Sequence, residues 1–471
     1  MAQVDRKKQY EDVLATPVKS FFVNMLTRDI SLIDAILDLL DNSVDGILRT
    51  EPASKSNSPY KGFFADITLK KDSFTIHDNC GGIPWSLHEY AFRMGKPKET
   101  DSKNIHSIGA YGIGMKRAIF KMGSSCLIST QNGRDGYEVE ITPGWIEDQD
   151  EWKIPVHASR KTMKEDGTTI LVSELHGGVS DKFATEDIFA TELEKKIASH
   201  YALIIHKGFN VRVNGLSVKP KPIELLLEIS AKKAAIRPFI YRSTYDGVDI
   251  FLAVGFTHPI QSQEEINEDQ DEKKYSSEYA GWTVVCNDRA VLYCDKSELT
   301  GWGEAGVPNY HPQFNPISGI VEFHSKDPSK LPTTTSKRGI DTSSKLYLQV
   351  KNKMREGLQL FTNYTNKWKV NISDAKEHLR NTRTVSFATI KTEAARDLQF
   401  SNAKSFYLGG VQYKPELPLP VRPDTGLRRI TFSKQLKEIK TVSKYLFTDP
   451  DSAPSEVGAK CFEVMYEEAT K

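Results

Sequence analysis

One stretch, residues 31–46, constrains the fold of this chain more than any other. Apolar side chains recur in it every three or four residues, which predicts an amphipathic helix. Acidic side chains line a second face, and no basic residue occurs between Arg28 and Arg49. Such a face suits a helix turned toward a cation, but runs of like charge are also commonly hydrated. The apolar stripe consists of Ile33, Ile36, Leu37, Leu40, Val44 and Ile47, and the acidic face of Asp34, Asp38, Asn42 and Asp45.

Length and composition limit what the rest of the chain can be. At 471 residues the chain exceeds one ordinary core, so two or three domains are expected. The net charge of +1 does not by itself favour nucleic acid as a partner. The sequence predicts neither a membrane span nor a signal peptide. The 5 cysteines form no CxxC pair, so we expect a cytoplasmic protein with reduced thiols and no zinc site.

The predicted elements divide the chain into four parts. Residues 1–20 form a polar arm, and residues 21–222 alternate helices with strand hairpins, which predicts an α+β sandwich. Residues 223–374 form a smaller α+β domain. Residues 375–471 are charged and then rich in proline, and they end in basic amphipathic helical sequence. That last helix is expected to be an ordinary surface helix packed on the preceding domain, with a DNA- or partner-docking helix as the alternative.

A glycine-rich stretch precedes a second predicted helix. Gly109, Gly112 and Gly114 stand just before Met115, where the helical pattern starts. Glycines there let the backbone approach phosphate groups, and the helix N-terminus offers free N–H groups. The pattern is weak when it stands alone, because glycine turns before helices are common. It fits neither a Walker loop nor a Rossmann unit.

Two short motifs could contact a nucleobase. Asp78 ends a predicted strand, where its carboxylate could accept a hydrogen bond from an amino group while Gly82 leaves room for a ring. The alternative is a turn that the Asp side chain caps. Thr168 opens another predicted strand, and it could bond a base or simply follow β-propensity.

Taken in order, these motifs resemble the GHKL ATPases: gyrase B subunits, ninety-kilodalton heat-shock chaperones, histidine kinases and MutL. The likeness covers about residues 20–220 and is greatest to the stand-alone, MORC-like branch, through residues 38–45 and 111–116. It implies a Bergerat-type α/β sandwich that binds ATP and Mg²⁺, followed by a transducer-like domain.

The resemblance also implies roles for individual residues. Asn42 matches the Mg²⁺-binding Asn, and one amide oxygen suits an ion that keeps most of its waters. Asp38, four residues earlier, matches the catalytic carboxylate. The remaining matches are Asp78, Gly82, Ile83 and Thr168 around the adenine, and Gly109, Gly112, Gly114, Met115 and Lys116 at the phosphates.

Two positions depart from the family pattern. Asp38 stands where the family has Glu, and a general base must come within hydrogen-bond reach of its water. Hydrolysis is therefore expected to be slow, and binding without turnover stays open. Cys80 replaces the first Gly of the adenine motif, so Gly81 is expected to supply the backbone freedom there.

In the second domain, residues 331–341 resemble the transducer loop that brings a Lys to the γ-phosphate. Lys337 is the first candidate and Arg338 the second, with a solvated basic loop as the alternative. The predicted function is an ATPase that acts as a nucleotide-driven homodimer switch, with DNA or a partner nuclease as client by family analogy. The alternative is an ATP-binding regulatory or scaffold protein with little or no hydrolysis.

Overall fold

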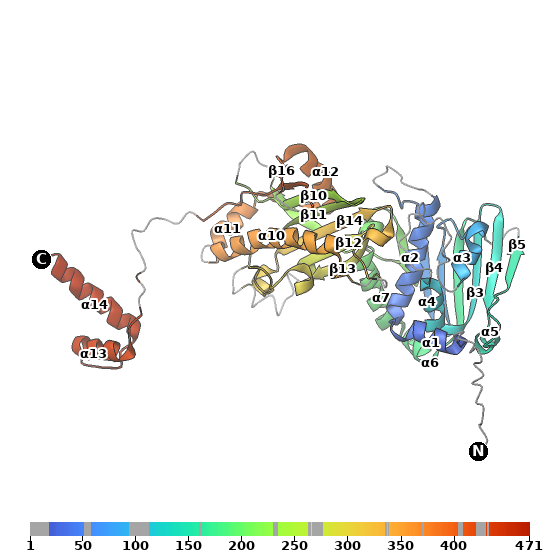
Figure 1. The fold of residues 1–471 in the computed structure, drawn as a ribbon, viewed down its shortest axis with the longest axis horizontal. Coiled ribbons are helices and arrows are strands. Elements are labelled where there is room, and N and C mark those ends of the chain that lie inside the picture. The colour runs from blue at the N-terminus through green and yellow to red at the C-terminus, as the bar shows by residue number, and fades with distance from the viewer. Residues whose placement is uncertain are drawn as a thin grey trace, which may run out of the picture. The chain divides into compact units, whose positions relative to one another are not determined.

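The chain forms two compact units, Met1–Pro420 and Val421–Lys471, coloured by residue number in Figure 1. The first unit holds two large sheets with their helices, and the described residues of the second form two helices. The computed structural model describes residues 18–50, 58–93, 113–159, 163–228, 234–261, 265, 277–334, 337, 339–369, 372–403, 408–420, 430 and 433–471.

The first sheet has 8 strands in the order β5-β4-β3-β6-β2-β1-β7-β8. Burial alternates along β1 and β2, so one face of the sheet packs on the core. Strands β1 and β2 form an antiparallel hairpin, as expected for a part of the chain predicted to contain strand hairpins. The bounds are β1 Phe64–Lys70, β2 Ser73–Asp78, β3 Gly123–Asn132, β4 Asp135–Ile141, β5 Val156–Ser159, β6 Gly167–Leu175, β7 Asn210–Val213 and β8 Leu216–Ser217.

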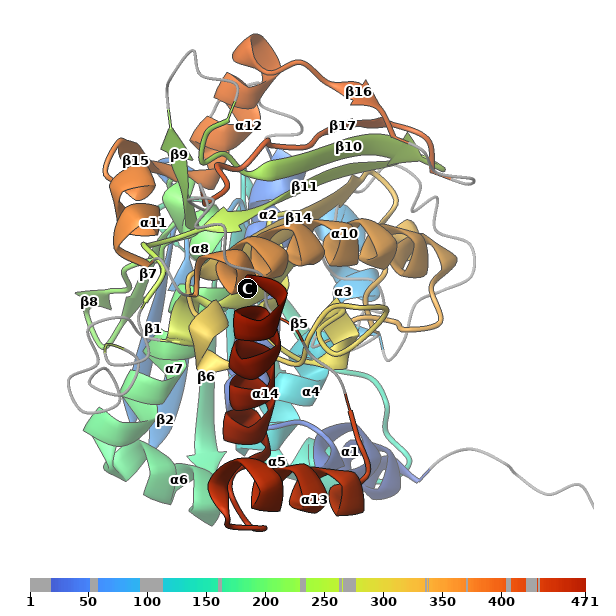
Figure 2. The ribbon, with the colours of Figure 1, turned by 90° about the vertical axis from the view of Figure 1, so that its left-hand side faces the viewer.

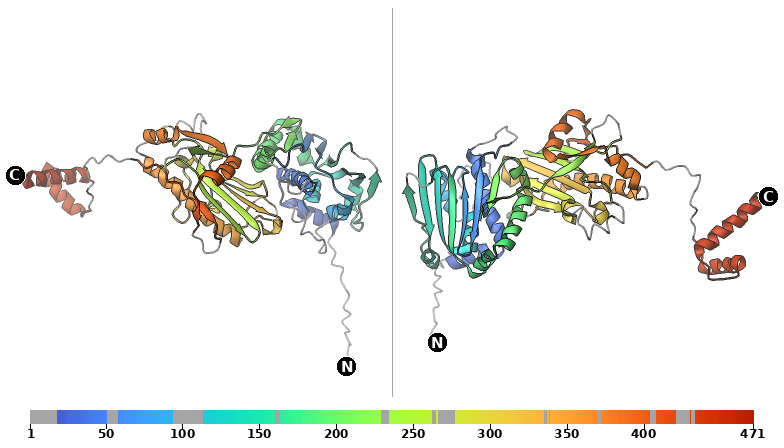
Figure 3. Two further views of the ribbon diagram at one scale, coloured as in Figure 1. Left: turned by 90° about the horizontal axis from the view of Figure 1, so that it is seen from above. Right: turned by 180° about the vertical axis from the view of Figure 1, so that it is seen from behind.

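The helix predicted at residues 31–46 is confirmed as α2, and its apolar stripe is buried in the core of this domain. α2 packs against α4, and α4 contacts β3 and β6. Seen from behind, the strands of the first sheet lie in front of α1, α2 and α4 (Figure 3). The helices here are α1 Lys19–Arg28, α2 Leu32–Thr50, α3 His88–Phe92, α4 Gly114–Met122, α5 Pro143–Glu147, α6 Gly177–Ala184, α7 Glu186–His200 and α8 Ala202–His206, with the 3₁₀ turn η1 Trp85–Leu87.

The second sheet has 7 strands in the order β13-β12-β14-β11-β10-β17-β16, and β15 pairs separately with β9. Strands β12 and β13 form a hairpin whose turn lies at Asn287 and Asp288. The sheet takes strands from as far as Tyr413, beyond residue 374. The bounds are β9 Glu224–Glu228, β10 Phe239–Tyr245, β11 Val248–Phe256, β12 Gly281–Cys286, β13 Arg289–Asp295, β14 Ile317–Ser325, β15 Thr382–Ser386, β16 Ser401–Asn402 and β17 Val411–Tyr413.

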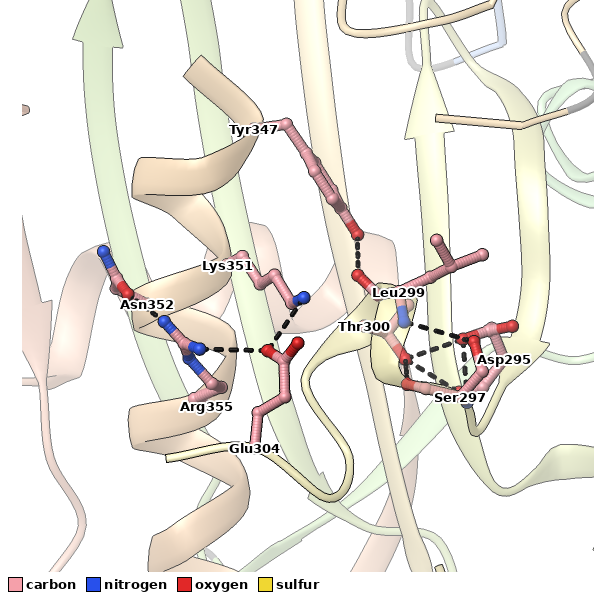
Figure 4. A network of polar contacts seen from close by, with 9 residues as sticks. All are labelled: Asp295, Ser297, Leu299, Thr300, Glu304, Tyr347, Lys351, Asn352 and Arg355. Atoms are coloured by element: carbon pink, nitrogen blue, oxygen red, sulfur yellow. Dashed lines mark hydrogen bonds and ion pairs between the residues drawn. The ribbon is translucent and has the colours of Figure 1, made fainter. Parts of the chain in front are cut away.

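Helix α10 packs across β10, β11 and β14 of the second sheet (Figure 2). Figure 4 shows how the loop after β13 is attached to this helix: Glu304 pairs with Lys351 at 2.8 Å and with Arg355 at 2.9 Å. The Tyr347 hydroxyl donates to the carbonyl oxygen of Leu299 at 2.8 Å. These contacts attach the loop after β13 to α10. The helices are α10 Lys345–Trp368, α11 Ile372–Leu379 and α12 Phe387–Asp397, with the 3₁₀ turns η3 Ser277–Tyr279, η4 Glu298–Thr300, η5 Pro312–Phe314 and η6 Pro328–Lys330.

The second unit consists of α13 (Leu436–Phe447), which carries the predicted basic amphipathic pattern, and α14 (Pro454–Ala469). The two helices pack against each other, but several large apolar side chains stay exposed, including those of Leu436, Tyr445 and Phe462. Among the described residues of the whole chain, the search found no helix with the length and hydropathy needed to cross a membrane.

Candidate functional site

A buried carboxylate joins the first sheet to α2. Asp78 ends β2 and accepts a hydrogen bond from the Ser43 hydroxyl of α2 at 2.7 Å. The backbone N–H groups of Cys80 and Thr168 donate to its other oxygen at 2.9 and 3.3 Å. Burial raises the pKa of Asp78, while these donors lower it. The structure therefore brings Asp78 and Thr168 together, opposite each other on β2 and β6.

The turn after Asp78 depends on two glycines in the left-handed region. Gly81 and Gly82 have φ of +84° and +65°, whereas Cys80 does not take a positive φ. Gly81 thus supplies the freedom that Cys80 lacks, as expected. A Cβ on Gly82 would lie 2.0 Å from the carbonyl oxygen of Gln131, so the protein's own strand β3 fills the space beside it. The half-buried Ile83 follows, and its N–H donates to the Thr130 hydroxyl at 2.8 Å.

Asn42 and Asp38 occupy neighbouring turns of α2 but differ in their partners. The Asn42 side chain is half-buried, and no residue in the described ranges bonds its amide. Asp38 is 8 % exposed, and its Oδ2 accepts from the Arg117 guanidinium of α4 at 2.5 Å. Burial raises the pKa of Asp38, and Arg117 opposes that rise. The amide of Asn42, the predicted metal ligand, therefore has no protein partner in the described ranges. The carboxylate of Asp38, the predicted general base, is already paired with Arg117.

Helix α4 begins at Gly114, where the glycine pattern ends. A Cβ at Gly114 would be in ordinary van der Waals contact with Asp38, 3.5 Å from its Cβ, so the start of α4 lies against α2. Met115 and Lys116 are buried, and the Lys116 Nζ donates to the carbonyl oxygen of Ala91 at 2.7 Å. Burial lowers the pKa of Lys116 to about 8. Gly109 and Gly112 lie outside the described residues.

A second acid of α2, Asp41, is fully buried and links three parts of the first unit. The Tyr201 hydroxyl donates to Asp41 Oδ1 at 2.5 Å, and Arg289 of β13 reaches the same oxygen at 2.9 Å. Lys337 lies 3.1 Å from the other oxygen. Burial alone would raise the pKa of Asp41, but Arg289 and Lys337 lower it to about 2. Asp41 is therefore a carboxylate shared by two cations of the second domain.

The predicted Lys337 thus comes from residues 331–341 to α2 and pairs with the residue directly before Asn42. Its φ is +56°, so the backbone of this loop is bent at the lysine. The second candidate, Arg338, lies outside the described residues.

Asp288, the neighbour of Arg289, makes another contact between the two domains. The Tyr60 hydroxyl donates to it at 2.9 Å, and Lys207 pairs with it at 2.6 Å. His324 lies 3.4 Å away, beside the buried Glu322. The three acid and imidazole groups lie close enough to hold a metal ion. Lys207 and Lys391 already neutralise the two carboxylates, so charge balance requires no ion there.

Sequence reasoning missed several members of this arrangement: Asp41, Ser43, Arg117, Thr130, Tyr201 and Arg289. A signal existed for Asp41, because its spacing from Leu37 and Val44 places it on the apolar stripe of the helix. A single acid on a buried stripe needs a partner, since an unpaired buried charge is costly. No comparable signal marks Arg117 or Arg289 as that partner.

Comparison with known protein families identifies the domain that holds α2 and Asp78. The family model "Histidine kinase-, DNA gyrase B-, and HSP90-like ATPase" matches residues 30–170. Those residues, from just before α2 to the start of β6, therefore form a GHKL-type ATPase domain. The match includes none of the second sheet. The comparison with curated proteins gives no match.

Proposed function

We propose that the ATPase domain binds Mg-ATP along α2, and that the nucleotide acts on the second domain through Lys337. The observation that carries the proposal is the hydrogen bond between Ser43 and Asp78. Ser43 is the chain neighbour of Asn42. One turn of one helix therefore sets the spacing between the carboxylate proposed for the adenine and the amide proposed for the metal ion.

At the adenine end, Asp78 would accept a hydrogen bond from the amino group of the base. Its three protein donors use Oδ1 twice and Oδ2 once, so Oδ2 keeps an acceptor site. Thr168 is hydrogen bonded to Thr130 beside it, and Ile83 would lie against the ring. Gly82 contributes by letting the turn approach β3, rather than by leaving a gap for the base.

At the phosphate end, Asn42 fits Mg²⁺ because its amide is partly accessible and has no partner in the described part of the chain. A hard cation with few protein ligands matches one amide oxygen. The bound ion would neutralise phosphate charge. Gly109, Gly112, Gly114 and the N–H groups of Met115 and Lys116 would hold the phosphates at the start of α4. The Lys116 side chain is occupied by Ala91, so its backbone is the part available.

For hydrolysis, Asp38 would act as general base toward a water molecule. Oδ1 of Asp38 accepts no bond from the described residues, which supports this role, whereas Oδ2 is paired with Arg117. The second candidate function is ATP binding with little or no turnover. It is favoured by the shorter Asp side chain, whose carboxylate is already engaged by a cation.

In the proposed switch, the second domain would change its position in response to the bound nucleotide. Arg289 and Lys337 come from different segments of the second domain and both reach Asp41, so displacement of Lys337 would change the contact between that domain and α2. Lys337 would exchange Asp41 for the γ-phosphate when ATP binds. The GHKL family suggests dimerisation, and resemblance to the stand-alone, MORC-like branch suggests DNA or a partner nuclease as the client.

Binding of a fluorescent ATP analogue to the full chain tests the site. We expect Asn42→Ala and Asp78→Asn each to weaken affinity at least about tenfold, because each removes a contact that other residues cannot replace. Asp72→Asn, in the exposed turn between β1 and β2, is the matched control and should bind normally. Unchanged affinity in both site variants would mean that the nucleotide binds elsewhere. Phosphate release by Asp38→Ala then separates the ATPase from the scaffold function.

The switch and its client need a separate experiment. We expect the chain to become dimeric with a non-hydrolysable ATP analogue, as measured by light scattering after size exclusion. Repeating the measurement with DNA at two salt concentrations tests the client, since contacts to phosphates weaken steeply with salt. A mass that does not change with nucleotide would contradict the dimer switch.

A further inference from the structure

Two buried acids on α2, Asp38 and Asp41, pair with cations that come from different elements. Asp41 pairs with Arg289 and Lys337 of the second domain, whereas Asp38 pairs with Arg117 of α4. The two acids are three residues apart and therefore neighbours on the helix. Without Arg117, Asp38 would be a buried carboxylate beside a second one, which is an unfavourable arrangement.

Arg117 is held firmly enough to fix the carboxylate. Its backbone N–H donates to the carbonyl oxygen of Ile113 at 3.0 Å, in the first turn of α4. Its neighbours Lys116 and Ala118 are buried, so the helix cannot turn freely. The Arg117 side chain is 17 % exposed, and its Nε is buried without a partner among the described residues. Among the described residues, the guanidinium therefore donates to Asp38 alone.

This contact occupies only one oxygen of Asp38. Oδ2 accepts from Arg117, and Oδ1 receives no bond from the described residues. An ion pair on one oxygen limits rotation of the carboxylate about its last torsion, so the second oxygen keeps one direction. The fixed direction of this oxygen matters more for Asp than for Glu. The Asp side chain is one methylene shorter, so it cannot extend toward a water molecule that lies out of place.

We propose that Arg117 is a positioning residue of the ATPase site, which acts through Asp38 by fixing one carboxylate oxygen and neutralising its charge. The proposal rests on the function proposed above. Arg117 follows directly on the residues expected to hold the phosphates, so α4 would set the place of the phosphates and of Asp38 together. A loss of the pair would leave a negative carboxylate facing the triphosphate.

A double-substitution cycle tests whether Arg117 acts through Asp38. The proteins are wild type, Arg117→Met, Asp38→Asn and the double variant, each measured for kcat and for affinity toward a non-hydrolysable ATP analogue. We expect Arg117→Met to lower kcat about 10- to 100-fold, as for a misplaced base. It should also weaken affinity about tenfold, because the unpaired Asp38 repels the phosphates.

In the double variant the effect of Arg117→Met should disappear. Its kcat should equal that of Asp38→Asn, and its affinity should return to within about threefold of that variant. Arg117→Lys keeps the positive charge but not the planar guanidinium, so its kcat should lie between those of Arg117→Met and the wild type. Lys121→Met is the matched control on the same helix: Lys121 bonds the carbonyl oxygen of Thr27 and should leave both quantities unchanged.

The outcomes separate the two proposals. Losses that add in the double variant would show that Arg117 contacts the nucleotide directly, and wild-type values in Arg117→Met would show that it has no role; either overturns the inference alone. Absence of ATP binding by the wild type and by Lys121→Met overturns the proposed function and the inference with it. If the wild type binds ATP without turnover, the ATP-analogue affinities of the four proteins still test whether Arg117 acts through Asp38. Thermal unfolding of each variant, with the charge-balanced double variant as reference, excludes loss of folding as the cause.

Discussion

Asp41 of α2 and Arg289 of β13 form a buried ion pair at 2.9 Å across 248 positions of sequence. The guanidinium also lies over the ring of Tyr201, 4.7 Å from its centroid, while the Tyr201 hydroxyl donates to the same carboxylate. This pair anchors the second domain to the helix that carries Asn42. The pair therefore provides a direct contact through which the proposed switch could act on the metal-binding helix.

Substitution of Asp41 by Asn should destabilise the protein by about 3–5 kcal/mol, because it leaves Arg289 buried without its charge partner. Denaturant unfolding measures this loss. Asp29→Asn, an exposed acid after α1, is the control and should change stability by less than about 0.5 kcal/mol. A small effect at Asp41 would mean that water reaches the pair.

Lys337→Met should cost little stability, about 1 kcal/mol or less, because Asp41 keeps Arg289 and Tyr201. ATP turnover should nevertheless fall at least about tenfold if Lys337 contacts the γ-phosphate. Lys330→Met, in the same segment and paired with the exposed Asp246, should change neither quantity. Normal turnover in Lys337→Met would remove it from the proposed site.

Gly82→Ala should destabilise the protein by about 3 kcal/mol or more, because strain at positive φ is combined with a clash against the backbone of Gln131. Gly133→Ala provides a matched comparison, since Gly133 has φ +59° but open space around its Cβ position. That variant should lose only about 1–2 kcal/mol. Urea unfolding of the two variants side by side isolates the steric part; equal losses would contradict it.

Stability should fall below neutral pH in a way that depends on His200. Burial, assisted by Arg289, lowers the pKa of His200 to about 4, and its Nδ1 donates to the carbonyl oxygen of Ala290 at 2.7 Å. Between the unfolded pKa near 6.5 and the folded pKa, the unfolded chain binds a proton that the folded chain excludes. Unfolding free energy should therefore drop by about 1–2 kcal/mol from about pH 7 to about pH 5.

His200→Asn should remove that part of the pH dependence, because an amide nitrogen can donate to Ala290 without titrating. Chemical unfolding at several pH values measures the difference. Parallel slopes for wild type and His200→Asn would show that His200 does not titrate in this range.

Local pattern predicted the elements of the ATPase domain well. The period of the apolar stripe located α2, alternation located β1 and β2, and the glycine at position 114 marked the start of α4. Asp78 was expected at a strand end, which is where it lies. These features depend on spacing along a few residues, which a sequence records directly.

The period of α2 by itself determined that acids would line this helix, and the resemblance added which of them to expect near a nucleotide. Only the tertiary structure decided how two of these acids are balanced: Asp38 by Arg117, and Asp41 by Arg289 and Lys337, 248 and 296 positions further along the chain. It also decided that Gly82 is needed against β3. The physical reason is that charge pairing and steric contact depend on distance in space, which exists only after the two sheets and α2 have packed together.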